Sequence, residues 1–283
     1  MKINIWLNDY YNRYNLSPKN QYNHIDVELF HKIIDETNKE DLIILRGEPT
    51  IHPFLWQLLN KLEDRNYILS TESTNINPLI NYKKNIPYIS FRFDGYQNDQ
   101  IKGQRSLSLN MNKIISEFSG KQTILRIEYT ISPYNMEYLD ADMMLIRKIV
   151  NQHSKMKNPY FVIYQQSEIY NHQGYIWTPL SKEKINQLNK FGLLSQRSMK
   201  FFDAWLNKRD YSCLSPRNQL VIDYNGDVRL CQSMRFYDII GSVKEENLQD
   251  IVNNTKSTRD KASECPMRQQ CWLAYHYKDN VNA

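Results

Sequence analysis

The stretch Leu42-Ile-Ile-Leu-Arg-Gly-Glu-Pro49 decides the fold, because an apolar run leads directly into a polar turn there. Four consecutive apolar residues are typical of a parallel strand that is buried on both faces of its sheet. The apolar positions of residues 54–62, after the turn, predict a helix. The order of strand, polar turn and helix indicates one β/α unit of an α/β fold.

Five more strands are expected at similar intervals along the chain. Asp26 is expected to cap the first helix, whose apolar positions include Phe30 and Ile33. Alternation of strands and helices favours a parallel sheet, which we expect to curl into a partial (β/α)6 TIM-like barrel. The expected strands are 2–7, 42–45, 67–70, 88–93, 124–131 and 160–165, and the later helices are 107–118, 136–150 and 181–191.

Parallel sheets of this kind carry their chemistry at the carboxyl ends of the strands. Residues 8–15, 46–48, 71–73 and 94–95 each follow an expected strand, so we expect them on one rim. A carboxylate at such a strand end, here Glu48, should point into a cavity and need a cationic or hydrogen-bonding partner.

All four cysteines lie in the last quarter of the chain, at Cys213, Cys231, Cys265 and Cys271. Residues 220–230 are typical of two strands joined by an Asn-Gly turn, and this hairpin is expected to bring the first two thiols together. Four thiolates suit a [4Fe–4S] cluster or a structural zinc ion, and the spacing does not decide between them. Unrelated buried cysteines are the alternative, whereas disulfides are disfavoured because we find no export signal.

Composition limits the classes of function. The 283 residues are 41% hydrophobic and 24% charged, and the length suffices for one large α/β domain with an appendix or for two ordinary domains. From the strand pattern and the clustered cysteines we expect the partial barrel at 1–200 and a small cysteine-rich β-hairpin and helix module at 201–283. No apolar run is long enough to cross a bilayer, so we expect a cytoplasmic protein without a membrane partner. The net charge of +5 is dispersed, without basic clusters among aromatics, so nucleic acid is not expected as a partner.

The order of these motifs resembles the radical SAM enzymes that carry a C-terminal SPASM or twitch module, over almost the whole chain. Arg46-Gly-Glu-Pro49 is similar to that family's Gly-Gly-Glu-Pro motif, which implies that Gly47 and Glu48 help to bind S-adenosylmethionine, with Glu48 on its amino group. Ser90-Phe-Arg-Phe-Asp-Gly95 is similar to the strand that lies near the cofactor ribose, which implies roles for Ser90 and Asp94. Cys213-x12-Gly226-x4-Cys231, followed by Cys265 and Cys271, is similar to the SPASM order and implies an auxiliary cluster.

The sequence departs from this family at the first loop, where active members place Cys-x3-Cys-x-aromatic-Cys. Asn8, Asn12 and Asn15 stand at the three cysteine positions, and Tyr14 keeps the aromatic one, in the expected cofactor site. Amides are hard, weak donors, whereas iron–sulfur clusters need soft thiolates. We therefore expect no radical-generating cluster and no cleavage of S-adenosylmethionine. The loop is polar and is expected to face solvent, and its asparagines fit either a deliberate replacement or loss of the chemistry in a natural relative.

Three readings of function follow. The resemblance implies radical modification of a peptide or protein side chain, with an external reductant, in a chain whose radical site is disarmed. The second reading is a natural pseudoenzyme that binds a peptide or a small molecule. The third is an interaction protein stabilised by zinc.

Overall fold

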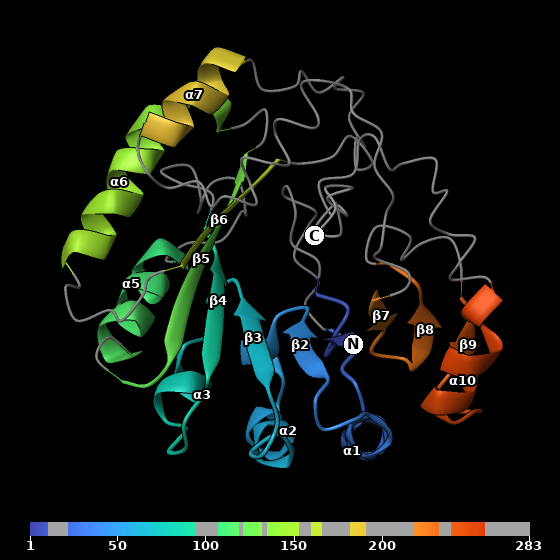
Figure 1. Ribbon diagram of the computed structural model, residues 1–283. Coiled ribbons are helices and arrows are strands. Elements are labelled where there is room, and N and C mark those ends of the chain that lie inside the picture. The colour runs from blue at the N-terminus through green and yellow to red at the C-terminus, as the bar shows by residue number, and fades with distance from the viewer. Residues whose placement is uncertain are drawn as a thin grey trace.

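The computed structural model describes residues 1–10, 22–93, 107–118, 121–131, 135–152, 160–165, 182–190, 218–231 and 239–257. These contain a nine-stranded sheet with the order β6-β5-β4-β3-β2-β1-β7-β8-β9, in which β1 to β6 are parallel. Figure 1 shows the sheet curving, with helices along its outer side. The expected partial barrel is confirmed.

The elements agree with the sequence pattern to within a few residues. The strands are β1 (Lys2–Trp6), β2 (Leu42–Arg46), β3 (Tyr67–Thr71), β4 (Tyr88–Arg92), β5 (Ile124–Ile131), β6 (Tyr160–Gln165), β7 (Gln219–Ile222), β8 (Asp227–Arg229) and β9 (Gly241–Ser242). The helices are α1 (Val27–Glu36), η1 (Pro49–Ile51), α2 (Leu55–Lys61), α3 (Asn77–Ile80), α5 (Leu107–Phe118), η3 (Met136–Tyr138), α6 (Leu139–Gln152), α7 (Lys182–Lys190) and α10 (Leu248–Asn254). Among the described elements, η1, α3 and β9 had no counterpart in the expected set, because segments of two to four residues are too short to show a periodicity.

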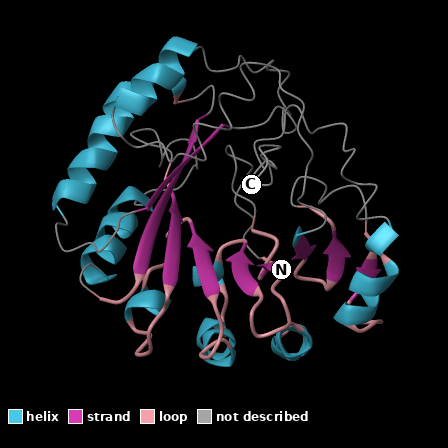
Figure 2. Ribbon diagram, in the orientation of Figure 1, coloured by secondary structure: helices cyan, strands magenta, loops and turns pink. Residues whose placement is uncertain are grey.

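The two faces of the sheet differ in chemistry. Residues such as Ile3, Ile43 and Leu45 belong to the hydrophobic core, together with the apolar faces of the outer helices (Figure 2). Successive side chains of a strand point to opposite faces. The alternate residues, Asn4 on β1 and Arg46 on β2, therefore face the inner side of the curved sheet. The inner face therefore carries the polar side chains of Asn4 and Arg46 next to the apolar Trp6 and Ile44.

Helix α1 begins as the sequence predicts. Oδ1 of Asp26 accepts hydrogen bonds from the backbone N–H groups of Glu28 at 2.9 Å and Leu29 at 3.1 Å. These bonds satisfy N–H groups that have no partner within the helix. Phe30 and Ile33 on the same helix are fully buried against the sheet. The cap and the apolar stripe together fix α1 beside β1 and β2.

The C-terminal hairpin belongs to the same sheet as the barrel. Strand β7 pairs with β1 in parallel, from Lys2 opposite Gln219 to Ile5 opposite Ile222. Residues 223–226 connect β7 to β8, so the connection is longer than the Asn-Gly pair. The Gly226 N–H closes the turn by donating to the Asp223 carbonyl at 2.8 Å, with Gly226 at φ +90°. The two predicted domains thus share one sheet, and the boundary near residue 200 stays a prediction.

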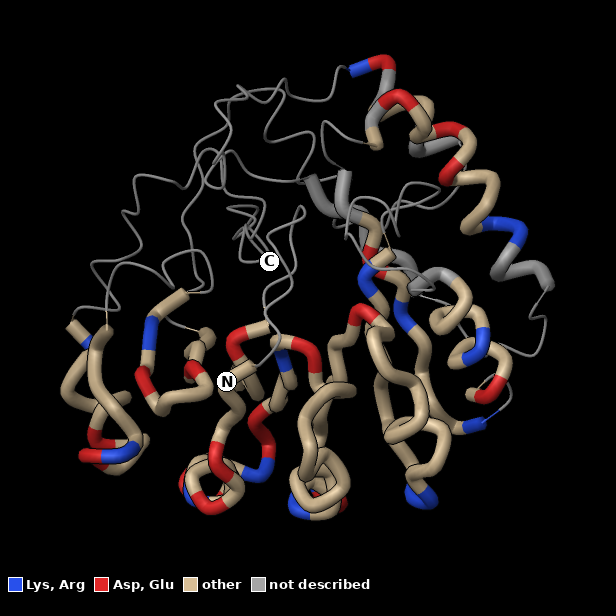
Figure 3. Tube along the Cα trace, turned by 180° about the vertical axis from the view of Figure 1, so that it is seen from behind, with Lys and Arg blue, Asp and Glu red and all other residues tan. Residues whose placement is uncertain are grey.

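Charged residues of both signs are distributed over the described trace in Figure 3, consistent with the dispersed net charge of the sequence. Within the described residues, none of the helices is both long enough and apolar enough to span a bilayer.

Candidate functional site

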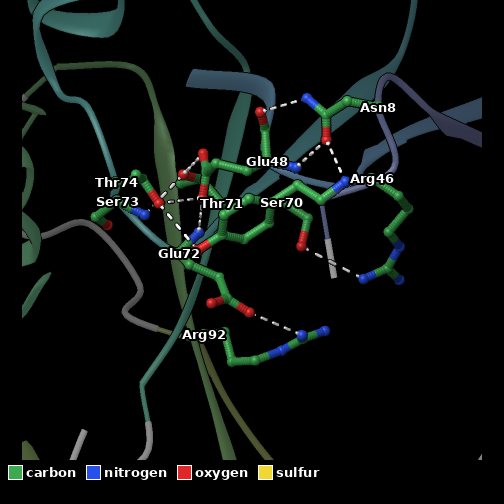
Figure 4. Close-up of polar contacts among 10 residues, drawn as sticks. Asn8, Arg46, Glu48, Ser70, Thr71, Glu72, Ser73, Thr74 and Arg92 are labelled. Atoms are coloured by element: carbon green, nitrogen blue, oxygen red, sulfur yellow. Dashed lines mark hydrogen bonds and ion pairs between the residues drawn. The ribbon is translucent and has the colours of Figure 1, made fainter. Parts of the chain in front are cut away.

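Three strand ends meet at the rim where the sequence predicts the site. Asn8 follows β1, Gly47 and Glu48 follow β2, and residues 71–74 end β3 and continue beyond it (Figure 4). Hydrogen bonds between these segments confirm that they lie together. The predicted site residues Asn12, Tyr14, Asn15, Asp94, Cys213, Cys265 and Cys271 lie outside the described residues.

Asn8 is fully buried, so the expectation that it faces solvent is wrong. Its Nδ2 donates to the Glu48 carbonyl at 2.9 Å, and its Oδ1 accepts from the N–H groups of Glu48 at 2.9 Å and Tyr10 at 3.3 Å. Buried backbone groups need such partners, and an amide supplies both a donor and an acceptor. A thiol offers only a weak donor and a weak acceptor. Asn8 therefore joins the first loop to the turn after β2.

Gly47 makes this close approach possible. Its φ of +78° lies in the left-handed region, where side chains are strained. A Cβ at this position would lie 2.4 Å from Oδ1 of Asn8 and 3.0 Å from the Asn8 carbonyl oxygen. The motif glycine is therefore required both by its backbone conformation and by the amide packed against it.

The carboxylate of Glu48 is held by hydrogen-bond donors from within the protein, as the sequence reasoning required. Oε1 accepts from the Thr50 N–H at 3.1 Å, the Thr50 hydroxyl at 2.5 Å and the Thr71 hydroxyl at 2.6 Å. Oε2 accepts from the Glu72 N–H at 2.6 Å and the Thr74 hydroxyl at 3.4 Å. Glu48 thus ties the ends of β2 and β3 together.

Burial raises the pKa of Glu48, while the hydrogen bonds from Thr50 and Thr71 act in the opposite direction. The side chain has no exposed surface, and both oxygens already accept hydrogen bonds. Its assignment to the amino group of a cofactor therefore stays a prediction.

Two ion pairs lie on the inner face: one joins β4 to the residue after β3, and the other lies within β5. Arg92 lies 3.1 Å from Glu72, and Arg126 lies 3.2 Å from Glu128. The hydroxyl of Ser90, a predicted site residue, is fully buried and donates to Oε1 of Glu128 at 2.7 Å. Ser90 therefore lies on β4 as predicted, and its hydroxyl bonds to the neighbouring strand β5.

Arg46 stands on the same face, where the family motif has glycine. Its Nη1 donates to the Ser70 hydroxyl at 3.3 Å and its Nε to Oδ1 of Asn4 at 3.4 Å. Figure 4 shows the side chains of Arg46, Ser70 and Arg92 extending into one region. The guanidinium thus lies against the neighbouring strands β1 and β3.

The arginines determine the charge of Glu128. Burial raises the pKa of Glu128, but the positive charges of Arg126, Arg46 and Arg92 outweigh burial and lower the pKa to about 2. Glu128 is therefore ionised at neutral pH, with three guanidinium groups near it. Our sequence reasoning missed this set, although the alternation of Arg126 and Glu128 with Leu125 and Ile127 in β5 was a usable signal.

Two histidines pack behind the turn that follows β2. His52 is buried, with Nε2 3.1 Å from the Ile25 carbonyl and Nδ1 accepting from the Phe54 N–H at 3.1 Å. Burial lowers the pKa of His52 to about 4. The ring of His24 lies 5.0 Å away, and burial lowers its pKa too. His52 is held neutral and links the turn to the segment before α1.

Cys231 is the described member of the predicted cysteine set. It follows β8 and is 5% exposed. Over the stretches that the structure describes, no group of three or more His, Cys, Asp or Glu residues is arranged to hold a metal ion. A buried thiol beside a hairpin fits the soft donor that a cluster needs, and the ligand set stays a prediction.

Comparisons with known proteins support the C-terminal assignment and the fold. Residues 213–273 match the SPASM family, an iron-sulfur cluster-binding domain. No curated protein sequence matches the chain. The match and the shared fold confirm the resemblance to radical SAM proteins with a SPASM module.

Three solved structures illustrate the shared fold. Streptococcus suis SuiB bound to precursor peptide SuiA superposes with a TM-score of 0.68 at 14% identity, over 95% of this chain and 70% of that chain. SuiB bound to S-adenosylmethionine gives 0.66 at 14% identity, over 95% and 71%. Native anSMEcpe with bound AdoMet gives 0.60 at 13% identity, over 96% and 89%. At these identities the likeness establishes the fold alone.

Proposed function

We propose that this chain is a protein of radical SAM fold that binds a peptide or protein substrate without generating a radical at its first loop. An auxiliary iron–sulfur cluster in the SPASM segment completes the proposal. The observation that carries it is the buried amide of Asn8, which bonds both backbone groups of Glu48. That amide stands where the resemblance places the first cluster thiolate.

The contacts of Asn8 argue against a loop that holds a cluster. Its amide is engaged by three backbone groups and is sealed against Gly47, so it has no surface to offer to iron. A side-chain amide is also an unsuitable ligand for iron in a cluster, because iron–sulfur clusters are held by thiolates. The residue at this position therefore does not fit the radical-generating cluster.

The peptide substrate is supported by two solved structures of the same fold. SuiB was crystallised with precursor peptide SuiA, and anSMEcpe with the Kp18Cys peptide. In this chain the inner face of the sheet carries the guanidinium groups of Arg46, Arg92 and Arg126, which can orient a polar segment.

The auxiliary cluster is proposed at Cys213, Cys231, Cys265 and Cys271, all within the segment that matches the SPASM family. A bound cluster would supply an electron-transfer centre. The chain contributes the thiolates and the burial around Cys231, which excludes water from that ligand. Zinc is the competing metal for the same four thiolates.

Anaerobic reconstitution with iron and sulfide tests the proposal. We expect about four irons per chain, in keeping with one cluster, and no 5′-deoxyadenosine above the no-protein blank after addition of S-adenosylmethionine and a strong reductant. The comparison protein carries Asn8→Cys, Asn12→Cys and Asn15→Cys together. Formation of 5′-deoxyadenosine by the unaltered chain would contradict the proposal. One zinc ion per chain and no iron would show that the four cysteines hold a structural metal instead of a cluster.

A further inference from the structure

We infer that the inner face of the sheet is a recognition site for a carboxylate of an acidic peptide, held by Arg46, Arg92 and Arg126. The inference rests on the proposed function, because it specifies the substrate class of the same face. It concerns the chemistry of the peptide rather than the chemistry of a cofactor.

The solvent exposure of the paired side chains determines which of their charges a ligand can contact. In the pair of Arg92 and Glu72 the arginine side chain is 16% exposed and the glutamate 5%. In the pair of Arg126 and Glu128 the values are 19% and 5%. Each glutamate thus lies behind its arginine, and the accessible members of both pairs are cations.

The buried glutamates hold these cations in one place. Glu128 is ionised with Arg126, Arg46 and Arg92 around it, and like-charged guanidiniums would otherwise repel one another. Its position is itself fixed by the Ser90 hydroxyl at 2.7 Å. Preorganised donors lose little side-chain entropy when a ligand binds.

The geometry of guanidinium selects the ligand. Its planar donors match the two oxygens of a carboxylate or phosphate, often in a bidentate arrangement. Arg46 adds a third guanidinium, which donates to the Ser70 hydroxyl at 3.3 Å and to Oδ1 of Asn4 at 3.4 Å. A peptide carboxylate, from an acidic side chain or from a free C-terminus, supplies the matching anion.

The test uses the full chain and calorimetric titration with acetylated, amidated hexaglutamate at low and moderate salt. We expect binding that weakens with salt, no binding of the matching hexaglutamine, and competition by inorganic phosphate. Hexaglutamine with a free C-terminus separates the two sources of carboxylate. Equal binding of the two amidated peptides, or binding insensitive to salt and phosphate, would overturn the inference.

Variants locate the site. Arg46→Gln is expected to weaken hexaglutamate binding by about tenfold, and Arg46→Lys less, because the charge remains while the fork is lost. Arg147→Gln, at an exposed position of α6, is the matched control and should bind as the parent does. A folded Arg46→Gln protein with parental affinity would reject this site. Failure of peptide binding leaves the iron content and the 5′-deoxyadenosine result unchanged, so the two proposals fail separately.

Discussion

Asn8 links the first loop to the turn after β2 through its buried side-chain amide. Its amide satisfies both backbone groups of Glu48 and the N–H of Tyr10 in a site without water-exposed surface. A buried backbone group that loses its partner costs the free energy of its desolvation. Asn8 therefore contributes to the stability of the fold.

Asn8→Ala is accordingly expected to lower the free energy of unfolding by roughly 2–4 kcal/mol, because two backbone groups of Glu48 lose their partner. Urea unfolding monitored by circular dichroism measures the change. Asn112→Ala, at an exposed position of α5, is the control and should stay within about 0.5 kcal/mol of the parent. Equal stability of the two variants would show that the Asn8 contacts contribute nothing.

His52 makes the stability depend on pH. Its folded-state pKa of about 4 lies below the unfolded value near 6.5, so only the unfolded chain binds the proton between these values. Stability is therefore lost as the pH falls from about 6.5 towards 4, by roughly 1–2 kcal/mol at pH 5. His52→Asn should reduce this loss, and the raised pKa of Glu48, which acts in the opposite direction, cancels in the comparison.

Urea titrations of both proteins at pH 7.5 and pH 5 measure the His52 contribution. A proton NMR titration of the histidine ring signals provides the control, because the signal absent from the variant identifies His52. A ring that titrates near pH 6.5 in the folded protein, or an identical loss of stability in both proteins, would refute the prediction.

At the scale of elements, the C-terminal helix is fastened to the first helix of the barrel. The Leu248 N–H at the start of α10 donates to Oε2 of Glu36 at 2.7 Å, and the Gln249 side chain donates to the Glu36 carbonyl at 3.1 Å. A carboxylate at a helix N-terminus also interacts favourably with the helix dipole. Glu36 therefore acts as a second cap, supplied by another element.

Glu36→Ala should loosen α10 locally, by about 1 kcal/mol, without unfolding β3 or β4. Hydrogen exchange followed by mass spectrometry should show faster exchange in residues 241–257 and parental rates in the barrel strands. Glu245→Ala, an exposed glutamate in the same segment, is the control. Unchanged exchange in α10 would mean that its own cap, Asn247, suffices.

Periodicity predicted the elements well because their apolar patterns are local. The apolar strand at Leu42–Arg46 and the helix cap at Asp26 could both be predicted from neighbouring residues alone. The burial of Asn8 was not, because it depends on a turn forty residues away in the chain. The pairing of β7 with β1 was hidden for the same reason, since it joins segments more than two hundred residues apart.

At the scale of the molecule, this pairing changes what the predicted metal module can do. Four residue pairs between β1 and β7 make the hairpin an extension of the barrel sheet, and Asn4 adds a side-chain bond to the Leu220 carbonyl at 3.3 Å. Strand β1 also pairs with β2, and Asn8, which follows it, holds the turn after β2. Strand β1 therefore connects the hairpin, which pairs with it, to the candidate site, which Asn8 contacts.

Loss of the proposed cluster should consequently destabilise the whole chain. Cys213→Ala with Cys231→Ala removes two of the four proposed ligands, and metal binding is coupled to folding. We expect the double variant to lose its iron and to melt in a single transition, with Tm lowered by on the order of 10 °C. Calorimetry with iron analysis measures both, and the parent chain stripped by a chelator is the control. Two separate transitions with the barrel unchanged would show that the module folds independently, and full iron content would show that these thiols are not ligands.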